Sequence, residues 1–133
     1  MYEEQLLDLK IEKLEKLLKL DDLLIEAMER EDMDSIASLM EEKFMVINEI
    51  KVIDKKLKDK RKEKIFSEQR EQRFRYIKQA LNRLKNKEEM LLYMAYEKIE
   101  QIEKELEQID NALKIKEKYK KMKERKSIFE RVG

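Results

Sequence analysis

The sequence contains no proline and a single glycine, Gly133, which is its last residue. Proline and glycine are the residues that most often interrupt helices and form tight turns, so this chain has few strong breaks. A β-sandwich, a barrel or an α/β fold needs many tight turns, and turns with positive φ favour glycine. The sequence is therefore unfavourable for all three of these fold classes.

Cysteine, histidine and tryptophan are absent as well. Without cysteine the chain can form neither a disulfide framework nor a thiolate metal site. Without histidine and cysteine, the usual general bases and nucleophiles reduce to carboxylates, lysine, serine and tyrosine. A phosphate-binding loop would need glycines that the chain does not have. We therefore predict no catalytic residues, no metal site and no cofactor, and we interpret the protein as a non-enzyme.

Charged residues make up 47% of the 133 residues and hydrophobic residues 41%. Such a composition, rich in Glu, Lys, Leu, Ile and Met, is typical of long helices when the apolar residues recur at helical spacing. No stretch approaches the roughly 20 apolar residues of a membrane span. The N-terminal residues also lack the basic-then-apolar pattern of a signal peptide. We expect a cytoplasmic protein without membrane insertion.

Apolar residues recur every three or four positions in three long segments, and each segment predicts a helix. The first helix is expected from about Glu3 to Glu31, with an apolar face wide enough to contact two neighbouring helices. Asp21 interrupts its heptad seam. A tight corner follows at residues 31–35, where Asp32 is a good N-cap because its carboxylate can accept hydrogen bonds from the free amides of the next turn.

The seams of the other two helices are interrupted once each, at Lys43 in the second and at Glu88 in the third. The third seam also contains a four-residue step from Ala95 to Ile99. Such a step is a stutter, which locally unwinds a left-handed supercoil. The third segment is the longest, so we expect part of its apolar seam to stay exposed in a monomer.

Because the connection between them is short, the first two helices are expected to form an antiparallel hairpin. We predict an all-α fold, in which this antiparallel helical hairpin and one long C-terminal helix form a coiled-coil-like three-helix bundle. A single helical domain covers residues 1–133, with the hairpin at 1–64, the long third helix at 65–121 and a flexible basic tail at 122–133. Over residues 55–75 the apolar pattern thins, and a helical extension and a polar loop both remain open.

The charges are unevenly distributed although the net charge is only +1. Residues 51–87 carry 15 basic and 5 acidic side chains, whereas residues 1–50 carry 6 basic and 15 acidic ones. Folding the chain back near residue 65 would place basic residues beside basic residues, which is unfavourable unless that tip is solvated or bound to an anionic partner. Aromatic residues lie among these basic ones, a combination that can bind single-stranded nucleic acid. We favour a solvated tip over a nucleic-acid partner.

The segment from Leu23 to Lys43 combines a Leu-rich helix, the acidic corner Glu31-Asp32-Met33, and a second helix with the repeat from Leu39 to Lys43. In these features it resembles the first hairpin of the FlgN/FliT-type flagellar export (type III secretion) chaperones. The order of two hairpin helices and one long helix is also similar to that family. The resemblance is clearest over residues 23–53 and loose over 81–122.

The resemblance implies a cytosolic chaperone that binds the terminal helices of secreted filament-type or cap-type flagellar subunits and keeps them soluble for export. It also implies docking to an export-gate or export ATPase component, for which Tyr119 is the nearest match to a tail aromatic. In the family the cargo docks largely on the later helix. The corresponding cargo-binding residues here are Ile99, Ile102, Leu106, Ile109 and Leu113.

Three alternatives remain open. The chain could be a structural coiled-coil adaptor or a stalk-like regulator of an export ATPase, because composition alone supports this interpretation almost equally. It could, as a second alternative, be a nucleic-acid-binding helical protein. The apolar residues of the third helix could also close a homodimer instead of binding cargo.

Overall fold

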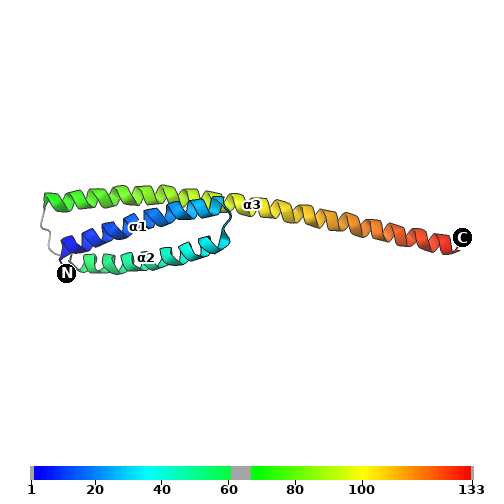
Figure 1. The fold of residues 1–133 in the computed structure, drawn as a ribbon, viewed down its shortest axis with the longest axis horizontal. Helices are drawn as coiled ribbons and strands as arrows, with labels where there is room; N and C mark the ends of the chain where they lie inside the picture. The colour runs from blue at the N-terminus through cyan, green and yellow to red at the C-terminus, as the bar shows by residue number, and fades with distance from the viewer. Residues whose placement is uncertain (1, 61–66, 133) are drawn as a thin grey trace. The chain divides into compact units, whose positions relative to one another are not determined.

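The computed structural model describes residues 2–60 and 67–132, with the side chains of residue 60 and of residues 127–132 left out. It contains three helices, α1 (Glu3–Glu29), α2 (Met33–Lys60) and α3 (Glu68–Val132), shown in Figure 1. The described residues include no strand. The prediction of an all-α hairpin followed by one long helix is confirmed.

The chain divides into two compact units, Met1–Met94 and Ala95–Gly133. The boundary between the units falls beside the four-residue step from Ala95 to Ile99. The first unit contains the hairpin and the first part of α3, and the second unit consists of the remainder of α3. At this point the apolar seam changes register along α3.

The structure decides most of a segment that the sequence leaves open, and it extends the third helix beyond its predicted end. Residues 55–60 and 68–75 are helical, which resolves most of the segment that was left open, while residues 61–66 lie outside the described part of the chain. At the other end α3 continues to Val132, through residues that we predicted to form a tail. The physical reason is the absence of proline and glycine before Gly133, so that nothing in the sequence stops the helix.

The corner between α1 and α2 is closed by backbone hydrogen bonds. The amide of Glu31 donates to the carbonyl of Met28 at 3.2 Å, and the amide of Asp32 donates to that of Ala27 at 3.0 Å. This pair of bonds is the Schellman arrangement, in which the residue after the C-cap adopts a left-handed conformation. Glu31 has a φ of 56° although glycine is preferred there. The paired carbonyls at the end of α1 offset the conformational cost of a side chain at this position.

Asp32 caps the start of α2 as predicted. Its carboxylate accepts hydrogen bonds from the Ser35 amide at 3.2 Å and from the Ser35 hydroxyl at 2.6 Å. These hydrogen bonds to Ser35 lower the pKa of the Asp32 carboxyl below its ordinary value. The corner is therefore specified by one acceptor side chain in addition to the backbone bonds of the preceding helix.

Asp32→Ala is expected to lower the thermal unfolding midpoint by a few degrees, because α2 loses the acceptor for its first free amides. Asp32→Asn keeps an acceptor oxygen at the same place and is the matched control, with a smaller expected effect. Both midpoints can be measured by circular dichroism during heating. An unchanged midpoint in Asp32→Ala would show that this hydrogen-bonded cap does not stabilise the corner.

Helix α1 lies at the centre of the first unit, as its wide apolar face predicted. The buried core draws on all three helices and takes half of its members from α1. Its residues are Leu6, Leu7, Leu14, Leu17, Leu18 and Leu20 of α1, Val46, Ile53 and Leu57 of α2, and Ile77, Ala80 and Leu84 of α3. Burial of this aliphatic surface is the main favourable contribution to folding of the unit.

Ion pairs show how the helices run past one another. Three lysines along α1 contact carboxylates of α2 in reverse order, which is the antiparallel arrangement. The pairs are Lys10 with Asp54 at 2.6 Å, Lys13 with Glu49 at 2.5 Å, and Lys16 with Glu42 at 3.7 Å. Helix α3 contacts α1 in the same order along both helices, with Arg70 near Glu3, Arg73 near Asp8 and Lys87 near Asp22, so these two helices are parallel.

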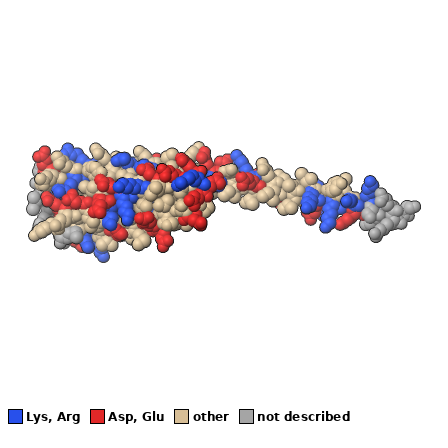
Figure 2. All heavy atoms as spheres, in the orientation of Figure 1, with Lys and Arg blue, Asp and Glu red and all other residues tan. Residues whose placement is uncertain are grey.

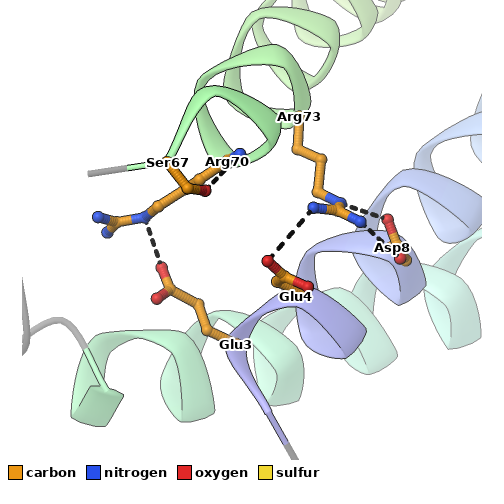
Figure 3. Close-up of polar contacts among 6 residues, drawn as sticks. All are labelled: Glu3, Glu4, Asp8, Ser67, Arg70 and Arg73. Atoms are coloured by element: carbon orange, nitrogen blue, oxygen red, sulfur yellow. Dashed lines mark hydrogen bonds and ion pairs between the residues drawn. The ribbon is translucent and has the colours of Figure 1, made fainter. Parts of the chain in front are cut away.

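The start of α3 is held to the acidic start of α1 (Figure 3). Arg70 lies 2.9 Å from the Glu3 carboxylate, and Arg73 lies 2.7 Å from Asp8 and 3.9 Å from Glu4. Arg70 and Arg73 thus face acidic residues of α1, which relieves the unfavourable pairing of basic with basic residues at the start of α3. Figure 2 shows basic and acidic side chains intermixed on the visible face of the first unit.

Candidate functional site

Five predicted cargo residues form one apolar line along α3 in the second unit. They are spaced three and four residues apart, so they share one side of the helix. Their exposed fractions are 50% for Ile99, 44% for Ile102, 60% for Leu106, 56% for Ile109 and 59% for Leu113. We call these five residues the α3 stripe. At about 1.5 Å per residue the α3 stripe extends over roughly 21 Å.

The exposure of the α3 stripe contrasts with the burial of leucines earlier in the same helix, in the first unit. Leu84 and Leu91 are each 8% exposed. A soluble protein seldom leaves a contiguous row of aliphatic side chains in water, and such a row generally marks an interaction surface. The pattern of the sequence predicted which residues form the line, and the structure shows that they are exposed.

Tyr119, the predicted docking residue, is on a different side of the helix. It is 68% exposed, and its apolar neighbours are Ile115, four residues before it, and Met122, three residues after it. Tyr119 lies six positions after Leu113, which corresponds to an angle of about 120° around the helix axis. The structure therefore does not bring Tyr119 together with the α3 stripe, and its role in docking remains a prediction.

A charged cluster inside the first unit was not anticipated. Asp21, Lys43 and Glu88 each interrupt the apolar seam of a different helix, and the fold brings all three together. The Lys43 ammonium lies 2.9 Å from an Asp21 carboxylate oxygen and also forms an ion pair and hydrogen bond with Glu88. Asp21 is fully buried, Lys43 is 7% exposed, and Glu88 reaches the surface. We call these three residues the seam triad.

The signal for the seam triad was present in the sequence. Each helix carries exactly one charged residue on its predicted seam, and the signs are acid, base and acid in chain order. Buried charges are tolerated when they are paired. Three isolated charged residues of complementary sign, one on each seam, therefore favour an arrangement in which they meet in one layer of the helical bundle. What the spacing could not supply was the relative register of the three helices, which decides whether the interruptions meet.

The seam triad has a distinctive electrostatic environment. Burial of Asp21, together with the nearby Glu88 carboxyl, raises the pKa of Asp21 to about 6, although Lys43 acts in the opposite direction. Burial disfavours the charged form of Lys43, yet Glu88 and Asp21 together raise the pKa of Lys43 above its ordinary value. Lys43 therefore stays charged, and Asp21 is the member of the triad that titrates near neutrality.

The raised pKa predicts a pH dependence of stability. The folded state holds a proton on Asp21 up to about pH 6, whereas the ordinary value for an aspartate is 3.8. The stabilising contribution of this proton is complete below the unfolded-state pKa and disappears as the pH rises through the folded-state pKa. Wild type should therefore gain roughly 1–3 kcal/mol relative to Asp21→Asn between pH 7 and pH 4.

The measurement is urea unfolding of both proteins across this pH range. The comparison with Asp21→Asn removes the contributions of titrating groups outside the seam triad, which the two proteins share. Titration of the Asp21 carboxyl carbon by nuclear magnetic resonance gives the folded-state pKa directly. A stability difference that does not change with pH would contradict the raised pKa.

The described residues 2–60 and 67–132 offer few other candidate sites. None of the three helices in this part of the chain combines the length and the apolar content that a membrane crossing requires. The same residues contain no cluster of carboxylates placed to hold a metal ion. Comparison with protein-family models, with curated proteins and with solved structures finds no match for this chain. The class that the fold defines is thus an all-α hairpin with a long third helix.

Proposed function

We propose that this protein is a cytosolic flagellar export chaperone, which binds amphipathic terminal helices of secreted flagellar subunits and keeps them soluble. The observation that carries the binding function is the exposure of the α3 stripe. An amphipathic helix recognises such a surface through apolar residues that recur every three or four positions. The choice of flagellar subunits as cargo is based on the resemblance of residues 23–53 to the hairpin of the export chaperones.

The physical role follows from the hydrophobic effect. Amphipathic terminal helices of filament subunits aggregate when their apolar faces have no partner. Docking on the α3 stripe would bury both apolar faces, at roughly 25 cal/mol per Å² of apolar area before the cost of association is subtracted. Binding of the isolated subunit also lowers the concentration that is free to aggregate. Hand-over to an export-gate or export ATPase component would then release the cargo.

The double variant Ile109→Asp plus Leu113→Asp is expected to abolish cargo capture. Two carboxylates in the C-terminal part of the stripe would have to be buried without partners when the cargo helix docks. Because both residues are exposed in the free protein, the fold of the first unit should be unaffected. Affinity capture from the native cytosol, followed by mass spectrometry of the bound proteins, measures the effect and identifies the cargo.

Gln108→Asp plus Asn111→Asp is a matched control, because these residues lie on the opposite side of the same helical turns. This control should capture a secreted flagellar subunit as well as wild type does. Unimpaired capture by the stripe variant would place the binding surface elsewhere. Recovery of an ATPase without any secreted subunit would favour the alternative of an adaptor or stalk-like regulator.

A further inference from the structure

The charges beside the α3 stripe restrict what can dock on it. Within residues 99–113 there are five acidic side chains and one basic side chain, Lys104. Lys104 lies on the side of the helix opposite the stripe, where its ammonium is 3.5 Å from the Glu100 carboxylate. The surface that a docking helix would meet is therefore apolar in the middle and acidic at its edges.

Three of the acidic residues border the stripe directly. Glu103 and Asp110 are seven residues apart and lie on one edge, two turns from each other. Glu105 lies on the other edge. All three side chains are exposed. In a helix pair, residues at these edge positions contact the partner and determine which partner is accepted.

A second copy of the chain, placed with its stripe against this one, fits this surface poorly. In a parallel pair, Glu105 of one copy would lie opposite Asp110 of the other. In an antiparallel pair with stripe on stripe, each edge would meet the same acidic edge of the second copy. Lys98 precedes the stripe and already interacts within its own chain. Like charges across an interface oppose association, so the acidic edges act against pairing of one stripe with another.

We infer that the occupant of the α3 stripe is an amphipathic helix with lysine or arginine on both sides of its apolar face. This inference depends on the proposed function, and it adds the chemistry of the partner. Basic edge residues would form ion pairs with Glu103, Glu105 and Asp110 while the two apolar faces are buried. Long basic side chains would also cover part of the aliphatic surface with their methylene groups.

The test uses two synthetic peptides of about three heptads with the same Leu and Ile stripe, one with lysine and one with glutamate at the edge positions. Their binding to the full chain is measured by fluorescence anisotropy at low and at high salt. The lysine peptide should bind at least about tenfold more tightly at low salt, and this advantage should shrink as salt screens the edge charges.

Two charge-reversed proteins make the test specific. The edge variant Glu103→Lys, Glu105→Lys, Asp110→Lys should prefer the glutamate peptide. The control variant Glu97→Lys, Glu100→Lys, Glu107→Lys carries the same change in net charge on other sides of the helix, and it should keep the preference for lysine. Retention of the lysine preference by the edge variant would overturn the inference, because the edge charges would then not determine the preference. Loss of this preference in the control variant as well would overturn it too, because net charge alone would then explain the preference.

Failure of the inference can be distinguished from failure of the proposed function. Suppose that both peptides bind equally well and that Ile109→Asp plus Leu113→Asp abolishes this binding. That result would overturn the edge-charge inference and retain the stripe as a helix-binding surface. Peptide binding that survives this double change would contradict both proposals. A wild-type protein that sediments as a dimer through the stripe, and binds neither peptide, would overturn the inference in favour of a second copy as the occupant.

Discussion

Replacing Lys43 by methionine is expected to lower the free energy of unfolding by roughly 3–5 kcal/mol. Lys43 is the only cation in the seam triad, and its removal leaves the fully buried Asp21 beside Glu88 without a counter-charge. Methionine has a similar volume and leaves no large cavity, so the loss reports electrostatics rather than packing. The measurement is urea unfolding at pH 7, with the denaturant slope checked for an unchanged value.

The matched control replaces all three charges with leucine, Asp21→Leu, Lys43→Leu and Glu88→Leu. Removing a buried ionic group as a whole also removes the cost of taking its charges out of water. The triple variant should therefore be as stable as wild type or more stable by roughly 1–4 kcal/mol. If Lys43→Met and the triple variant are equally destabilised, the loss comes from packing at this layer and not from an unpaired charge.

Leu14→Ala is expected to cost roughly 2–5 kcal/mol, whereas the same change at Leu113 should cost less than about 0.5 kcal/mol. Leu14 is 1% exposed in the core of the first unit, and Leu113 is 59% exposed on the α3 stripe. Truncation of Leu14 removes buried surface and leaves a cavity. Truncation of Leu113 shortens a side chain that is already largely in water.

Thermal and urea unfolding of both variants measure the contrast, at two protein concentrations. The concentration series matters because self-association would bury the stripe and make its contribution depend on concentration. A cost above about 1 kcal/mol for Leu113→Ala that grows with protein concentration would mean that a second copy covers the α3 stripe. Independence of concentration is the result expected for an open binding surface.

The sequence by itself determined the local structure of this protein. The helical structure follows from the heptad spacing of apolar residues in a chain without internal proline or glycine. The position of the hairpin corner follows from the N-cap at Asp32. These signals act over a few residues, so they can be recognised without knowing the fold. For the same reason the residues of the α3 stripe were predictable from spacing alone. The conformation of Glu31, which takes a position that favours glycine, was not predictable from its residue type.

The short corner predicted that α1 and α2 are antiparallel neighbours, but only the tertiary structure decided where α3 packs and in what register the three helices lie. A heptad seam repeats, so a helix can slide by one heptad or choose another neighbour with little change in its apolar contacts. The charged side chains distinguish these arrangements because their pairing acts between residues far apart in sequence. Arg73 meets Asp8, and Lys43 meets Asp21, only when α1 lies between antiparallel α2 and parallel α3. The exposure of the α3 stripe was likewise decided in three dimensions, since burial depends on whether another helix covers a given face.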